Sequence, residues 1–278
     1  MDLGKIGVWT SSRAIGAEQL GTAARLVEEL GYGAFWLGGS PRLPALRPLL
    51  EATTKIVVGT SIVNIWAYEP ARLAAEYAEL APGFPERLLV GIGVGHPEAA
   101  GTYARPLTAM QAFLDGLDAA DPPLPRERRA LAALAPRMLR LSAERSLGAL
   151  PYFVQVAHTR AARQLLGPGV LLAPEVACVL DEDAERARAT AREYARMYLG
   201  LSNYTNNLIR HGFTEEDIAG GGSDQLIDAV IPHGTAEQVA AVVQEHFDAG
   251  ADHVALQVLG EPGIPRQGWT ALAESILR

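Results

Sequence analysis

The stretch KIGVWTSSRAIGAEQLGTAARLVEELGYGAFWLGGS, residues 5–40, decides the fold. Residues 5–10 form a short apolar run, which is typical of a buried strand. Residues 17–30 carry apolar side chains at helical spacing, and residues 34–37 form a second apolar run. The order strand, helix, strand with tight glycine turns predicts a βαβ unit and therefore a parallel sheet.

The same alternation continues to the end of the chain. Further strands are predicted at residues 56–62, 88–93, 129–134, 148–154, 171–180 and 253–258. Further helices are predicted at residues 69–81, 107–120, 136–145, 159–166, 183–199, 235–249 and about 269–277. Eight strands alternating with helices over 278 residues favour a (β/α)8 TIM barrel, which typically needs about 250 residues. A doubly wound open sheet is the alternative.

We expect one domain over residues 1–278, with an irregular segment at residues 200–232. Hydrophobic residues make up 49% of the chain, which is enough for one large core. The net charge of −8 does not favour nucleic acid or an anionic membrane as a partner. A single cysteine, Cys178, leaves no disulfide within the chain, and neither a signal peptide nor a membrane span is evident. A cytoplasmic location is therefore expected.

In a barrel of this kind the active site lies where the strands end. The strand end VGIGVGH, residues 90–96, carries glycines at every second position. It resembles a dinucleotide fingerprint only in part, because His96 stands where the last glycine belongs. Two interpretations stay open: Gly93 and Gly95 let a flat ring approach the backbone, or the glycines serve tight packing between strands.

His96 is the candidate acid–base residue, since histidine titrates near neutral pH and Glu98 follows two positions later. A solvated loop histidine is the alternative. The spacing of the other histidines predicts no metal site.

The run LAPR, residues 134–137, places a helix start directly after a strand. Free backbone N–H groups and the helix dipole favour an anion there, and Arg137 adds a positive charge. An ordinary surface cation is the alternative for Arg137.

Several runs together resemble the bacterial luciferase-like monooxygenase family, and most closely its actinobacterial branch that uses the deazaflavin coenzyme F420. These runs are IGVW (6–9), AFWLG (34–38), VGTSI (58–62), LVGIGVGH (89–96), APRML (135–139), NYTNNL (203–208) and AGADHVALQV (249–258). The resemblance implies a (β/α)8 barrel with an insertion after the seventh strand, which residues 200–232 match. It also implies a non-proline cis peptide at Ser61-Ile62, behind the cofactor ring.

The resemblance further implies which residues form the site. Cofactor-binding positions are Ser40, Thr60, Ser61, Ile62, Gly93, Val94, Gly95, Leu134, Ala135, Pro136 and Arg137. Trp9, Asn64 and Trp66 are expected to shape the substrate pocket, and His96 to act as acid or substrate contact. The chain departs from the family where Gly38-Gly39-Ser40 replaces an acidic or histidine residue, and where Ala135 replaces a glycine.

The leading hypothesis is an oxidoreductase that transfers a hydride between F420 and an organic small molecule. The first alternative is an FMN-dependent monooxygenase, and the second is a non-catalytic cofactor-binding protein on the same barrel. The family resemblance also implies a homodimer.

Overall fold

The computed structural model describes residues 1–96 and 105–277. Its strands are β1 (Ile6–Ser11), β2 (Ala34–Gly38), β3 (Val57–Thr60), β4 (Val63–Asn64), β5 (Leu88–Gly93), β6 (Arg129–Leu131), β7 (Gly148–Ala149), β8 (Leu171–Leu172), β9 (Glu175–Val179) and β10 (Val254–Leu259). Its α-helices are α1 (Ser12–Ile15), α2 (Leu20–Glu29), α3 (Arg47–Glu51), α4 (Pro70–Leu80), α5 (Pro106–Asp118), α6 (Pro136–Arg145), α7 (Val156–Leu166), α8 (Ala184–Leu199), α9 (Ser202–Arg210), α10 (Glu215–Ile218), α11 (Asp224–Val230), α12 (Ala236–Asp248) and α13 (Arg266–Ile276).

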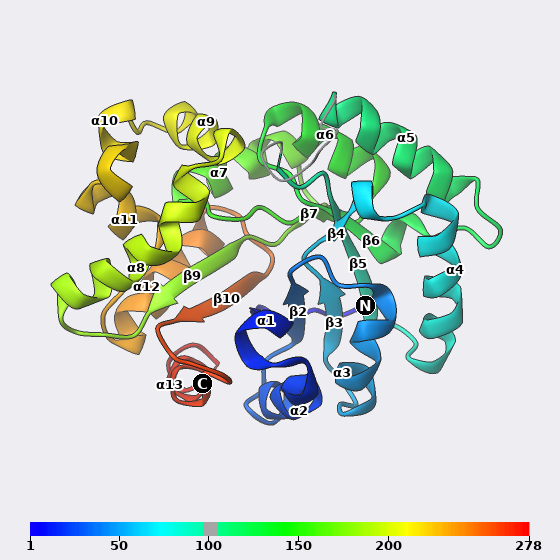
Figure 1. Ribbon diagram of the computed structural model, residues 1–278, viewed down its shortest axis with the longest axis horizontal. Coiled ribbons are helices and arrows are strands. Elements are labelled where there is room, and N and C mark those ends of the chain that lie inside the picture. The colour runs from blue at the N-terminus through cyan, green and yellow to red at the C-terminus, as the bar shows by residue number, and fades with distance from the viewer. Residues whose placement is uncertain (97–104, 278) are drawn as a thin grey trace.

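The strands form one curled parallel sheet with helices around its outside (Figure 1). The order is β8-β7-β6-β5-β3-β2-β1-β10-β9, and β4 pairs with β5. The two ends of this order, β8 and β9, are consecutive in the chain. The Glu175 N–H donates to the Pro151 carbonyl at 2.9 Å, and the Ala255 N–H donates to the Pro174 carbonyl at 3.0 Å. The predicted α/β class with a curled parallel sheet is confirmed and is consistent with a TIM-barrel-like fold.

Two of the predicted strands are interrupted. Residues 56–62 divide at the cis peptide Ser61-Ile62, so β3 pairs with β2 and β5 while β4 pairs only with β5. Residues 171–180 divide at Pro174, which lacks the N–H group that a ladder requires. As a result β8 pairs with β7, and β9 pairs with β10.

Besides the one-turn helix α1, which was not predicted, the helices depart from prediction in two places. The segment 200–232, expected to be irregular, contains α9, α10 and α11 on one side of the molecule (Figure 1); α9 and α11 pack on α8, and α10 packs on α11. The consecutive asparagines of α9 are weak helix formers, so the sequence alone does not predict this helix, which tertiary packing stabilises. Between β2 and β3 the sequence analysis placed no helix, yet a 3-10 turn (Leu43–Leu46) leads into the short α3 there.

Three apolar clusters hold the elements together. The largest lies between the sheet and its outer helices. A smaller one, which includes Trp36, Leu89 and Leu150, lies among the strands. The third includes Phe153, Tyr198 and Leu208, and joins α8, α9 and α11 to the strand ends. The segment 200–232 is therefore fixed over the ends of the strands, where a site is expected.

Within the described part of the chain, no helix is both long enough and apolar enough to span a membrane.

Candidate active site

A cavity of about 760 Å³ lies at the C-terminal ends of the strands. A volume of this size is typical of small-molecule sites. Its wall combines Trp9 of β1, the Ser61-Ile62 edge, His96 after β5 and Gln257 of β10. Helices α8 and α9 complete the wall with Tyr198, Asn203, Tyr204 and Arg210.

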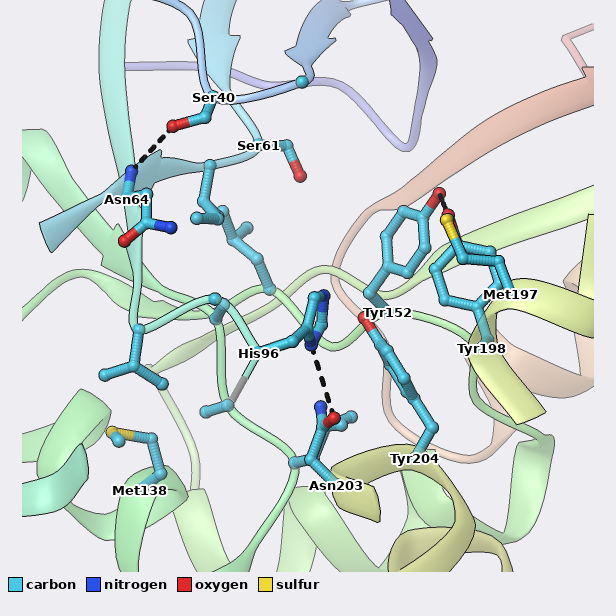
Figure 2. Close-up of a pocket in the computed structure, with 18 of the residues that line it drawn as sticks. Ser40, Ser61, Asn64, His96, Met138, Tyr152, Met197, Tyr198, Asn203 and Tyr204 are labelled. Carbon is cyan, nitrogen blue, oxygen red and sulfur yellow. Dashed lines mark hydrogen bonds between the residues drawn. The ribbon is translucent and has the colours of Figure 1, made fainter. Parts of the chain in front are cut away.

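The edge after β3 is built around the cis peptide Ser61-Ile62, as the resemblance implied. Ser40 stands beside it, and the Asn64 N–H donates to the Ser40 hydroxyl at 3.1 Å (Figure 2). A Cβ atom at Gly38 would lie 2.1 Å from the Trp9 ring. The Trp9 indole thus fills the space that an acidic or histidine side chain at this position would need.

The three alternate glycines serve different purposes. A Cβ at Gly91 would lie 2.0 Å from the Thr60 carbonyl oxygen, so this glycine is required by strand packing. A Cβ at Gly93 would lie 2.8 Å from the Ile62 side chain, which lines the cavity. Gly95 has a φ of +62°, a conformation that favours glycine. Strand packing therefore explains Gly91, while Gly93 and Gly95 shape the cavity edge.

His96 lies at the centre of the labelled residues in Figure 2. Its Nδ1 atom is 3.3 Å from the Asn203 side-chain oxygen, and its ring centroid is 5.3 Å from that of Tyr204. Both partners belong to α9, so the segment 200–232 positions the candidate acid–base residue.

Tyrosine hydroxyls meet at one side of the cavity. The Tyr152 hydroxyl lies 2.7 Å from that of Tyr194 and 3.0 Å from that of Tyr198, and it donates to the Gln257 side-chain oxygen at 2.9 Å. The sequence analysis did not select these residues. The sequence could have indicated them, because Tyr194 and Tyr198 are one helical turn apart and so share a face of α8, and because Tyr152 follows a strand.

Below this network lies Glu175, which is 3% exposed. Burial raises its pKa to about 8, although the hydrogen bond from the Phe153 N–H opposes the rise. Its Oε1 atom has no hydrogen-bond partner among the described residues. Burial thus favours the neutral form of Glu175.

The cations of the cavity differ from the one predicted. Arg13 and Arg210 line it, and both are exposed. Leu134 and Ala135 of the predicted anion-binding turn line it as well, and the Leu134 carbonyl lies 3.1 Å from the His158 Nε2 atom. Arg137 is exposed and lies outside the described lining.

The structure brings most of the predicted residues together. Those that line the cavity are Trp9, Ser40, Ser61, Ile62, Asn64, Val94, Gly95, His96, Leu134 and Ala135. Those outside its described lining are Thr60, Trp66, Gly93, Pro136 and Arg137. Thr60 donates to the Gly91 carbonyl at 2.8 Å, and the Trp66 indole donates to the Val94 carbonyl at 2.7 Å. Both side chains therefore hold the backbone of the glycine strand end without lining the cavity. Glu98 lies outside the described residues.

Comparison with known proteins bears on this site. The family model of luciferase-like monooxygenases matches residues 1–120. The F420-dependent glucose-6-phosphate dehydrogenase of Microbacterium testaceum (strain StLB037) is 29% identical over 104 residues, which is 33% of this chain. The match spans about a third (31%) of that relative's length.

Solved structures resemble the chain over almost its whole length. An F420-dependent secondary alcohol dehydrogenase in complex with an F420-acetone adduct has a TM-score of 0.78 at 14% identity, covering 98% of both chains. The coenzyme F420-dependent tetrahydromethanopterin reductase of Methanopyrus kandleri has a TM-score of 0.70 at 16% identity, again covering 98% of both. The FMN complex of the oxygenating constituent of 3,6-diketocamphane monooxygenase from Pseudomonas putida has a TM-score of 0.70 at 12% identity, covering 99% of this chain and 98% of that one.

The family model and the curated relative support the luciferase-like family that the sequence motifs indicated, and they support an enzyme. At these low identities the solved structures establish the fold alone.

Proposed function

We propose that the chain is an F420-dependent oxidoreductase, which transfers a hydride between the deazaflavin and a small organic substrate. We also propose that its curled sheet is a complete (β/α)8 barrel, with residues 200–232 as an insertion after the seventh strand. The observation that carries the proposal is that Ser61, Ile62, Gly95 and His96 border one cavity at the strand ends.

The cavity suits such a cofactor chemically. The Ser61-Ile62 edge and the glycine strand end offer backbone and small side chains, against which a flat ring can lie. The exposed guanidinium groups of Arg13 and Arg210 suit the acidic tail of the cofactor. When bound, the deazaflavin accepts or supplies the hydride.

The protein then has to position the substrate and handle one proton. With the cofactor bound, oxidation of a carbinol to a carbonyl would leave the hydroxyl proton of the substrate for the protein to accept. The hydroxyl proton of the substrate passes to His96, whose orientation is set by Asn203 and Tyr204. In the reductive direction His96 returns a proton to the carbonyl oxygen.

Single-turnover reduction of bound oxidised F420, followed by loss of its absorbance over a panel of alcohols, tests this proposal. The proposal expects turnover that His96→Ala lowers at least about 100-fold while cofactor affinity is kept. Turnover only with FMN and dioxygen would support the monooxygenase alternative, and binding without any turnover would support the non-catalytic one. The homodimer and the cytoplasmic location stay predictions.

A further inference from the structure

Tyr152, Tyr198 and Tyr204 lie together on the side of the cavity away from Ser40 and Asn64 (Figure 2), and ring contacts extend this aromatic wall to Trp9 and His96. Ring centroids are separated by 5.3 Å from Trp9 to Tyr152, 5.4 Å from Tyr152 to Tyr198, 5.2 Å from Tyr198 to Tyr204 and 5.3 Å from Tyr204 to His96. Separations of this size are typical of aromatic contacts. Residues from β1, α8, α9 and two strand-end loops thus form one aromatic surface.

The hydroxyl group of Tyr152 in this wall is already occupied within the protein. The Tyr152 hydroxyl has three polar partners within 3.0 Å, among them the Tyr198 hydroxyl and Gln257. A phenol has one donor hydrogen and two acceptor sites, so the hydrogen-bonding capacity of Tyr152 is used within the protein. A substrate rich in hydroxyl groups would gain little from this wall.

The few charged side chains in the lining also disfavour a charged substrate. Among its described residues the side chains with a permanent charge are Arg13 and Arg210, which are exposed and which we assign to the tail of the cofactor. No carboxylate or lysine lines the described part of the cavity. A charged substrate would lose its hydration without gaining an opposite charge.

We propose that the substrate is an uncharged alcohol or ketone that carries a flat aromatic or conjugated ring. This inference rests on the proposed function, which assigns the Ser61-Ile62 edge to the cofactor and leaves the aromatic wall to the substrate. The ring stacks on Trp9 and Tyr152, which line the cavity and are half-buried, and the reacting oxygen lies toward His96.

The test compares three alcohols with the full chain saturated with oxidised F420. These are 1-phenylethanol, which is neutral and aromatic; 2-propanol, which is neutral and lacks a ring; and glucose 6-phosphate, which is a charged polyol. The expected kcat/KM for 1-phenylethanol exceeds the other two by at least about tenfold, the factor that one aromatic contact of about 1.4 kcal/mol provides. Equal or faster turnover of 2-propanol or glucose 6-phosphate would overturn the inference and leave the proposed function standing. Failure to bind F420 would overturn the proposed function and the inference with it.

A matched pair of variants locates the contact. Trp9→Leu should weaken calorimetric binding of acetophenone by about tenfold, whereas Trp9→Phe, which keeps an aromatic ring, should change it little. Binding of 2-propanol should be the same in both variants. Thermal unfolding and F420 titration verify that each variant is folded. Equal acetophenone affinity in folded Trp9→Leu and in the unsubstituted protein would contradict the assigned stacking.

Discussion

The Nδ1 atom of His96 lies 3.3 Å from the Oδ1 atom of Asn203, a residue 107 positions later in the chain. An amide oxygen only accepts hydrogen bonds, so Nδ1 carries the hydrogen in this contact. The neutral imidazole then has its basic lone pair on Nε2, the atom to which the proposed function assigns proton transfer. One contact between a strand end and α9 thus selects the tautomer of the candidate acid–base residue.

Substitution of His96 should lower kcat much more than substitution of Asn203. His96→Ala should lower kcat by a factor of about 100 to 10,000, the usual contribution of a positioned acid–base group. Asn203→Ala should lower kcat by about tenfold at most, because it removes one hydrogen bond of about 1 kcal/mol. Stopped-flow measurement of F420 reduction gives both values, and fluorescence titration should show unchanged F420 affinity. If kcat in His96→Ala equals that of the unsubstituted protein, another group handles the proton.

Substitutions in the glycine strand end should separate folding from binding. Gly91→Ala places a Cβ 2.0 Å from the Thr60 carbonyl oxygen, which cannot move without the strand, so we expect a loss of about 1–3 kcal/mol in the free energy of unfolding. Gly93→Ala places a Cβ 2.8 Å from Ile62, whose side chain can shift into the cavity. This variant should lose more F420 affinity than stability. Urea unfolding and F420 titration of both variants measure the two effects, and a reversed pattern would contradict the assignment.

Glu175 should make the folded protein less stable as the pH rises. Burial raises its pKa from 4.5 to about 8, so the folded protein keeps a proton that the unfolded chain releases. Between these values the contribution of Glu175 to the free energy of unfolding falls by up to about 1.4 kcal/mol per pH unit. Glu175→Gln stays neutral, so the stability of the variant relative to the unsubstituted protein should increase from pH 5 to pH 8. A difference that is constant over this range, measured by urea unfolding, would show that Glu175 is ionised.

His253 should have the opposite pH dependence. Trp36 Nε1 donates to its Nε2 atom at 3.0 Å, and its Nδ1 atom lies 2.9 Å from the Gly4 carbonyl oxygen, so the ring is neutral. Burial lowers its pKa from 6.5 to about 4, which means that the unfolded chain takes up a proton first. The stability that His253 contributes is therefore lost as the pH falls from 6.5 to 4. His253→Gln should unfold at lower urea concentration at pH 7 but lose less stability on acidification. Equal acid sensitivity of the two proteins would count against a buried neutral ring.

The arginines at the cavity mouth should contribute to cofactor affinity more than Arg137 does. Arg13→Gln and Arg210→Gln should each weaken F420 binding by about fivefold, equivalent to roughly 1 kcal/mol for an exposed ion pair, and the loss should shrink at high salt. Arg137→Gln is the matched control. A larger loss in Arg137→Gln than in the other two would favour the anion site predicted from the sequence.

The strand ends were predictable from the sequence, whereas the helices that cover them were not. Apolar runs between glycine turns locate β1, β2 and β5 because parallel strands buried on both faces need such runs. The motif resemblance located Ser61-Ile62 and His96 at the cavity. Tyr204 and Arg210 escaped prediction because α9 has low helix propensity and is stabilised by packing against α8. The direction of a side chain was also not predictable: Arg137 follows a strand as expected, but it lies outside the described lining of the cavity.

The most direct test of the central claim is an equilibrium titration of the full chain with oxidised F420 and, separately, with FMN. F420 fluorescence should saturate at one cofactor per chain, and an excess of FMN should not displace it. Tight, saturable binding of FMN with no binding of F420 would contradict the account.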